Sequence, residues 1–332
     1  MLNLSKFNSN ISKVVVLYLL LRLSSYSNVL NRRRLLPMLA KEHKDRSGPV
    51  FIALASVCWS FGGVFIKFIP WGAMSIVGLR AFLAAIVFII YRRNFKIELT
   101  TGNILTAVCL SSTTVLYVFA NKLTTAAAAI LLQFTGPIFI ILIYLIFYKR
   151  KPTVSAIIAV VLTLLGMFLF FADNLDAGGV LGNILALLSG LAMAGVYVCN
   201  KRPDTTPENA LFLGFVINSC IGLPFTFFEV TADISAWIAV ILLGVVQVGF
   251  AYIFFSKGIK KTSALLACLT STLEPILNPI WVFLAGMWGI LHELEIPGRY
   301  AIIGGAVIIL TVVGYNIWVE RTAGNTGDDS VV

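Results

Sequence analysis

From residue 48 onward, the chain is a succession of long apolar stretches separated by short polar connections. An α-helix needs about 20 apolar residues to cross the hydrocarbon core of a bilayer, and most of these stretches have that length. In lipid, every backbone N–H and C=O must be paired inside the protein, so only helices and closed barrels span, and long stretches favour helices. The sequence therefore predicts an all-α integral membrane protein with ten transmembrane helices. The predicted spans are residues 49–69, 72–91, 103–121, 125–147, 153–172, 180–200, 209–228, 234–255, 262–289 and 299–319.

The composition agrees with lipid as the main solvent. Hydrophobic residues make up 59% of the chain and charged residues 12%, which is about half the charged share of a soluble domain. All five cysteines lie in apolar stretches without a C-x-x-C pair, which indicates small buried side chains and neither a disulfide framework nor a zinc site. The sequence has no HExxH, P-loop or GxSxG motif. We therefore expect no enzyme activity, no cofactor and no bound metal.

The first 48 residues form a basic tail, with nine lysine and arginine residues against two acids. Such a tail favours a cytosolic, headgroup-facing position over nucleic-acid binding, because no soluble fold accompanies it. Two further interpretations stay open: a targeting segment, or an over-extended start with the natural chain beginning at Met38. No part of the transport argument depends on this tail.

The basic residues of the connections predict the orientation. Cytoplasmic connections carry an excess of lysine and arginine. With the basic tail inside, twelve such residues lie at the inner ends of the spans and three at the outer ends. Both termini are therefore predicted to be cytoplasmic. The inner residues are Arg92, Arg93, Lys96, Lys149, Arg150, Lys151, Lys201, Arg202, Lys257, Lys260, Lys261 and Arg321, and the outer ones are Lys67, Lys122 and Arg299.

The ten spans divide into two sets of five with related sequences. Each match is short, but all four keep the same order along the chain, as two copies of one unit would. The matches are 53–63 with 186–196, LYVFANK at 116–122 with AYIFFSK at 251–257, Pro137 with Pro275, and LTLLG at 162–166 with LTVVG at 310–314.

An odd number of spans in each copy places the second copy upside down in the membrane. We predict repeats at residues 49–172 and 180–319, followed by a polar tail at 320–332. Inverted repeats typically place a substrate site near the midplane of the bilayer, and alternating access follows from rocking one half against the other. This pattern predicts a secondary transporter.

Four segments also resemble a known family: ALASVCWSFGGVFIK at 53–67, GLRAFLAA at 78–85, AAAAILLQFTGPIF at 126–139, and SALLACLTSTLEPIL at 263–277 with Glu293 beyond. They are similar to the EamA family of the drug/metabolite transporter superfamily. The resemblance implies export of small metabolites or amino acids, and in eukaryotic relatives exchange of sugar-nucleotides or phosphorylated sugars. The first repeat departs from the pattern with Lys151 at the position that corresponds to Glu293.

Glu274 is the leading candidate for the transport site. It lies about 16 Å along its predicted span, and Pro275 and Pro279 follow it and each remove a backbone donor. A carboxyl group beside a broken helix at this depth predicts a site for a coupling proton or a substrate amine. A structural acid in a packed bundle is the alternative. The other candidates for the substrate or ion pathway are Arg80, Gln133, Gln247, Tyr117, Tyr252, Trp59, Tyr197, Asn278 and Trp281.

The sequence thus predicts a carrier in the cell membrane that moves a small polar molecule outward, with the lipid bilayer as its surroundings. Without an ATP-binding motif, its driving force would come from gradients, and coupling to protons is one hypothesis. An exchanger of sugar phosphates or nucleotide sugars and a non-transporting membrane scaffold or receptor are the alternatives. A channel is disfavoured, because no ring of charges or filter motif is present. No nucleic-acid partner is expected.

Overall fold

The computed structural model describes residues 47–66, 68–93, 96–174, 179–289 and 298–326. Over these residues the protein is helical and contains no β-strand. Most of the basic N-terminal tail, the end of the C-terminal tail, Lys67 and Glu293 lie outside the described residues, so the predictions made for them remain predictions.

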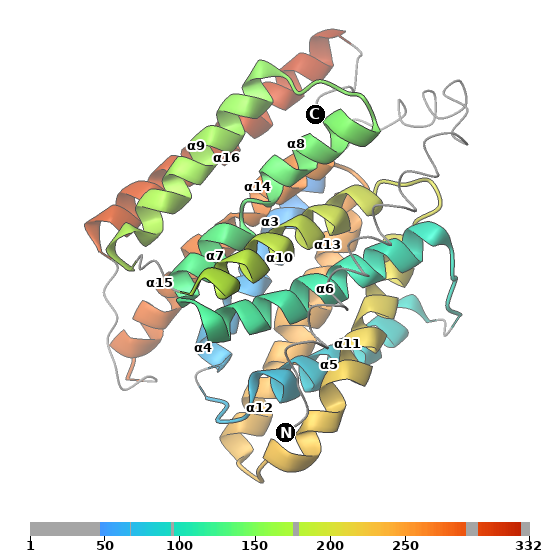
Figure 1. Ribbon diagram of the computed structural model, residues 1–332, viewed down its shortest axis with the longest axis vertical. Helices are drawn as coiled ribbons and strands as arrows, with labels where there is room; N and C mark the ends of the chain where they lie inside the picture. The colour runs from blue at the N-terminus through green and yellow to red at the C-terminus, as the bar shows by residue number, and fades with distance from the viewer. Residues whose placement is uncertain (1–46, 67, 94–95, 175–178, 290–297, 327–332) are drawn as a thin grey trace.

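The helices follow one another with short connections (Figure 1). In chain order they are α3 Ser47–Ser60, α4 Gly62–Ile66, α5 Ala73–Arg92, α6 Thr101–Leu123, α7 Ala126–Gln133, α8 Gly136–Phe147, α9 Val154–Phe171, η1 Ala172–Asn174, α10 Val180–Cys199, α11 Pro207–Glu229, α12 Ile234–Leu242, η2 Leu243–Phe250, α13 Ala251–Ile259, α14 Ala264–Ser271, α15 Leu273–Met287 and α16 Arg299–Thr326.

Eight helical segments are long and apolar enough to cross a membrane, and they coincide with the second to eighth and the tenth predicted spans. The protein is a multi-pass integral membrane protein. The first predicted span consists of α3 and α4 with an interruption at Phe61, and the ninth consists of α14 and α15 with an interruption at Thr272. The eight segments are Ala73–Arg92, Thr101–Leu123, Ala126–Phe147, Val154–Phe171, Val180–Cys199, Pro207–Glu229, Ile234–Ile259 and Arg299–Val319.

Proline explains two of the interruptions. Pro275 has no N–H to donate to the carbonyl group of Ser271, where α14 ends, and Pro137 has none for Gln133, where α7 ends. In both places the chain makes a tighter turn, with bonds of 3.1 Å from Thr272 N to Leu269 O and 3.3 Å from Thr135 N to Leu132 O. Pro279 behaves differently, because α15 continues through it. The expected break therefore lies before Glu274 and not after it.

The helices pack in antiparallel pairs. α5 lies along α11, α6 along α10, and α3 along α13, while α9 and α16 lie side by side at one edge of the bundle (Figure 1). Helices in lipid approach one another closely where their residues are small. Gly78 of α5 and Gly222 of α11 meet backbone to backbone, and so do Gly166 of α9 and Gly304 of α16.

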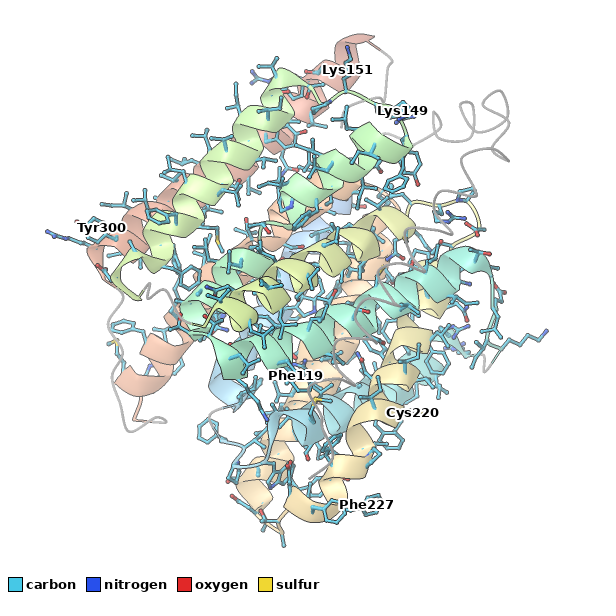
Figure 2. The ribbon with its side chains drawn as sticks, in the orientation of Figure 1. Phe119, Lys149, Lys151, Cys220, Phe227 and Tyr300 are labelled. Atoms are coloured by element: carbon cyan, nitrogen blue, oxygen red, sulfur yellow. The ribbon has the colours of Figure 1, made fainter. Side chains whose placement is uncertain are left out.

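Large apolar side chains cover the outside of the bundle, as a lipid-facing surface requires. Phe227 is 86% exposed, and it points away from α11 in Figure 2. The buried core lies between the helix pairs, and Phe88, Phe215 and Phe255 are among its largest fully buried side chains. Part of this core surrounds a cavity that polar and aromatic side chains line.

Candidate functional site

A cavity of about 180 Å³ lies inside the bundle. Its walls come from both halves of the chain: α3, α5, α6 and α7 of the first, and α10, α11, η2, α13, α14 and α15 of the second. Eight of the ten predicted pathway residues line it. They are Trp59, Arg80, Tyr117, Gln133, Tyr197, Gln247, Tyr252 and Glu274.

The cavity contains two opposite charges. Arg80 is in α5 and Glu274 is in the first turn of α15, and both side chains are partly buried. Among the described residues, neither forms a hydrogen bond, and no ion pair within 4.0 Å joins one to the other. Tyr117 and Tyr252 lie within electrostatic range of both charges. The site therefore presents a guanidinium group and a carboxyl group to whatever occupies the cavity.

The interrupted ninth span explains how Glu274 reaches the cavity. Ser271 ends α14, and α15 begins two residues later at Leu273, so the side chain of Glu274 leaves the second helix at its N-terminus. A helix N-terminus carries a partial positive charge that stabilises a carboxylate. Ser271 also lines the cavity. The interruption therefore combines a hydroxyl group and a carboxyl group on one wall.

Aromatic rings line one end of the cavity. Tyr252 packs edge-on against Trp59 and Phe215, with centroid distances of 5.0 and 5.3 Å, and Tyr197 packs edge-on against Phe255 at 5.4 Å. The phenol of Tyr197 is buried and donates a hydrogen bond of 2.7 Å to Ser271 Oγ. Since Tyr197 lies two residues before the end of α10, this aromatic end faces the connection between α10 and α11.

Side-chain amides hold the walls together. Gln133 Nε2 donates to Ser189 Oγ at 2.8 Å, and Ser189 Oγ donates to the carbonyl oxygen of Thr113 at 3.0 Å. Gln247 Nε2 donates to the carbonyl oxygen of Trp59 at 3.3 Å. Gln247 lies in η2, a π-helical segment between α12 and α13, and π-helical turns occur frequently at functional sites.

Two predicted pathway residues do not line the cavity. Asn278 and Trp281 lie one and two turns beyond Glu274 on α15. Trp281 Nε1 donates to Ser60 Oγ at 2.8 Å, and its ring stacks on Phe61 with a centroid distance of 4.6 Å. The indole thus packs α15 against the interruption between α3 and α4.

Four polar lining residues were not selected from the sequence: Thr113, Thr114, Asn218 and Ser271. The two threonines donate to carbonyl groups of their own helix, Cys109 and Leu110, at 2.8 and 3.1 Å. The signal that could have found them is helical spacing, because they lie three and four residues before Tyr117 and share its face. Ser271 lies three residues before Glu274 in one predicted span, so the same spacing could have found it, whereas for Asn218 the sequence held no comparable signal.

A polar network joins two connections at the end of the bundle beyond the aromatic rings. Arg92 Nη2 and the N–H of Glu98 both donate to Asn209 Oδ1, at 2.9 and 3.2 Å. Arg202 Nε pairs with Asp204 Oδ1 at 2.9 Å, and the N–H of Gly102 donates to Asp204 Oδ2 at 2.9 Å.

The network also sets the charge of Asp204. Partial burial by itself raises the pKa of this carboxyl group, but the hydrogen bond and charge of Arg202, together with the Gly102 N–H, outweigh it and hold the pKa below its usual range. The network thus holds the connection between α5 and α6 against the connection between α10 and α11.

The cavity walls offer hydrogen-bonding and charged groups for a small polar molecule. In the part of the chain that the structure describes, no three His, Cys, Asp or Glu side chains gather as metal ligands would. The arrangement can bind and orient a solute, and its opposite charges can neutralise a solute that carries both signs.

Comparison with known proteins agrees with this reading. The model of the EamA-like transporter family matches residues 46–172 and again residues 180–317. An uncharacterized transporter of Archaeoglobus fulgidus is 27% identical over 273 residues, covering 81% of this chain and 96% of that protein. The uncharacterized transporter YxxF of Bacillus subtilis is 26% identical over 163 residues, covering 46% of this chain and 51% of that protein.

A solved crystal structure has a similar fold, with a TM-score of 0.69 and 18% sequence identity, and the match covers 82% of this chain and 99% of that one. At that identity the likeness concerns the fold alone. The family match confirms the resemblance recognised in the sequence.

Proposed function

Because the chain belongs to the EamA-like transporter family, we propose that this membrane transporter is a secondary carrier that exports a small amphoteric metabolite, such as an amino acid, by alternating access. The observation that carries the proposal is the pair of opposite charges, Arg80 and Glu274, on the walls of one cavity. Neither side chain forms a hydrogen bond or an ion pair within 4.0 Å with a described residue.

The proposed architecture is ten spans in two inverted repeats of five, with both termini in the cytoplasm. The helix pairs support it. If a two-fold axis relates the two repeats, α5 corresponds to α11 and α9 to α16, and each of these helices packs against its own counterpart. The pairing of α6 with α10 corresponds to that of α13 with α3, which is also present. The family model matches twice, once on each proposed repeat.

The two charges favour an amphoteric substrate. A charged group within a membrane protein is costly unless it is paired or solvated. A carboxylate of the substrate at Arg80 and an ammonium group at Glu274 would pair both charges at once. This is the recognition that the free form of an amino acid allows.

A phosphorylated substrate fits the cavity less well. A phosphate monoester carries a charge of about −1.5 to −2. Arg80 is the one cation among the described lining residues, and the carboxyl group of Glu274 would repel the phosphate. The charges of the cavity therefore favour amino-acid export over exchange of sugar phosphates or nucleotide sugars.

Glu274 also supplies a means of coupling to protons. When an ammonium group leaves the carboxylate, a proton is the alternative counter-charge, so substrate and proton would compete for one group. Such competition produces exchange: a proton enters as the substrate leaves. The same carboxyl group would then serve binding and coupling.

We infer that the inner side of the cavity is closed in this conformation, because packed aromatic rings and a hydrogen-bonded network lie toward that side. Under the proposed orientation, the aromatic end and the network of Arg92, Asn209 and Asp204 lie on the cytoplasmic side. Loading of substrate from the cytoplasm would require this network to open. The interrupted helices at Phe61 and Thr272 are places where the spans could bend.

Transport by the purified protein in liposomes tests the proposal. Radiolabelled amino acids, sugars and hexose phosphates are offered to liposomes that contain the same unlabelled compound, with and without a pH gradient. We expect counterflow of one or more amino acids, faster release of preloaded amino acid when the outside is acidified, and no counterflow of hexose phosphate. Arg80→Gln should abolish the counterflow.

Two results would overturn the proposal in different ways. Counterflow of hexose phosphates without amino acids would establish the exchanger. An absence of counterflow for every compound, with correctly folded protein in the liposomes, would favour a scaffold or receptor.

A further inference from the structure

Three buried polar atoms on the cavity walls have no hydrogen-bond partner among the described residues. They are Trp59 Nε1, Asn218 Oδ1 and Gln247 Oε1. Their residues are 8%, 4% and 8% exposed. Buried polar groups in folded proteins are nearly always hydrogen-bonded, so each exception needs a physical explanation.

The orientation of the two amides follows from their other bonds. Gln247 Nε2 donates to the carbonyl oxygen of Trp59 at 3.3 Å, and Asn218 Nδ2 points toward Thr114 Oγ1 at 3.4 Å. These bonds use the amide nitrogens and leave both oxygens as acceptors. The indole nitrogen of Trp59 can only donate. The walls therefore offer one donor and two acceptors, all uncharged.

These three atoms belong to residues that line the same cavity as Arg80 and Glu274. Trp59 packs edge-on against Tyr252 at a centroid distance of 5.0 Å, and Tyr252 lies within electrostatic range of Arg80 and Glu274. The neighbouring walls are aromatic, because Phe255 packs on both Trp59 and Tyr252 at 5.8 Å. A substrate held by its two charged ends would place its side chain within reach of this region.

We propose that Trp59 Nε1, Gln247 Oε1 and Asn218 Oδ1 form a specificity subsite for an uncharged hydrogen-bonding side chain of the substrate, a hydroxyl or a carboxamide group. This inference rests on the proposed function, because it takes the charged ends of the substrate to be held by Arg80 and Glu274. A hydroxyl or carboxamide group can both donate and accept, which satisfies a mixed set of partners. An apolar side chain of the same size would leave the three atoms unpaired.

The size of the preference follows from the cost of unpaired groups. Sites built to hydrogen-bond a substrate discriminate strongly against an analogue of the same shape that lacks the group, by up to about 10⁴–10⁵-fold in well-studied cases. If water stays in the subsite when the apolar analogue binds, it pairs some of the polar atoms and reduces the free-energy cost of binding the analogue. We therefore expect a preference of at least about tenfold for the polar member of a matched pair.

Two matched pairs of amino acids test the subsite. L-Threonine and L-valine differ by a hydroxyl in place of a methyl group, and L-asparagine and L-leucine by a carboxamide in place of an isopropyl group. Dissociation constants are measured by calorimetry on the purified full-length protein, and counterflow in liposomes provides a second readout. The charged ends are identical within each pair, so the ratio within a pair reports the side chain alone.

Three variants and a control locate the effect. Gln247→Met and Asn218→Leu each remove an acceptor while keeping the bulk, and Trp59→Phe removes the donor while keeping an aromatic ring. In each of them the preference should fall to about threefold or less. The control is Asn316→Leu, because Asn316 is in α16 and does not line the cavity, and among the described residues its side chain bonds only the carbonyl oxygen of Val312 in its own helix, at 2.9 Å. The control should keep the wild-type preference.

The possible results separate this inference from the proposed function. Binding of threonine and valine with equal affinity, or a preference that survives in both Gln247→Met and Asn218→Leu, would overturn the subsite and leave the amphoteric site standing. If none of the four amino acids binds the wild-type protein and none is carried, the amphoteric site fails and the subsite fails with it. Thermal unfolding of each variant shows whether it is folded. If one variant does not fold, the preference measured in the remaining variants decides whether the subsite exists.

Discussion

The charge on Glu274 can be removed with little change to the rest of the protein. Glu274→Gln keeps the shape of the side chain and replaces the carboxylate by a neutral amide. The carboxyl group forms no hydrogen bond or ion pair with a described residue, so the substitution breaks no contact that the structure shows. Its effect should therefore be on the substrate and not on the fold.

The size of the effect follows from the environment of the group. A hydrogen bond to a charged partner contributes about 1.5–3 kcal/mol, and each 1.4 kcal/mol is about a factor of ten in affinity. Glu274 faces aromatic walls formed by Trp59, Tyr252 and their neighbours, where the low local dielectric strengthens a charged bond. We expect Glu274→Gln to weaken binding of the transported amino acid by about 10- to 150-fold.

A cycle of protein and ligand changes isolates the interaction. Calorimetry compares the amino acid with the carboxylic acid that lacks its amino group, on the wild-type protein and on Glu274→Gln. If the carboxylate binds the ammonium group directly, each single change lowers affinity, and the second change adds little to the first. Proton-driven transport should stop in the variant, while exchange without a pH gradient continues.

Glu229→Gln is the matched control. Glu229 accepts a hydrogen bond from Ser75 Oγ at 2.5 Å, which the amide oxygen of glutamine can also accept, and it lies outside the cavity. The Glu229→Gln variant should bind substrate as tightly as the wild-type protein does. The reasoning is refuted if the two changes in the Glu274 cycle are additive, or if Glu274→Gln transports with an unchanged pH profile, since Glu274 would then be a structural acid.

Two further predictions concern stability. A Cβ atom at Gly78 would overlap the backbone of Gly222. Gly78→Leu should therefore lower the thermal midpoint in detergent by several degrees or prevent folding, as overpacking by about 1–3 kcal/mol would. Gly314→Leu is the control, because a Cβ there meets nothing within 4 Å, and equal midpoints for the two variants would contradict the close approach of α5 and α11. Because the pKa of Asp204 is held below its usual range, its charge stabilises the fold above about pH 4 and this contribution is lost as the pH falls further. Asp204→Asn should therefore be less stable than the wild type at pH 7 and approach it in acid. A difference that stays constant across this range would exclude the pairing with Arg202 as its cause.

The sequence by itself determined the class of the protein. Because lipid requires a long apolar helix for each crossing, hydropathy was enough to place the eight helices that the structure shows as capable of spanning. Local chemistry was also readable: Pro137 and Pro275 remove backbone donors, and the helices are interrupted just before each of them. The resemblance to the EamA family came from short segments and was confirmed by the family match.

Only the tertiary structure decided which polar residues meet. Helical spacing shows which residues share a face, but the face that looks into a cavity depends on the helices packed around it. Arg80 and Glu274 come from different halves of the chain and line one space, while Trp281, on the same helix as Glu274, packs against Phe61 instead. Asn218 lines the cavity because α11 lies along α5 and α6, and this packing of distant segments is written in no local stretch of the sequence.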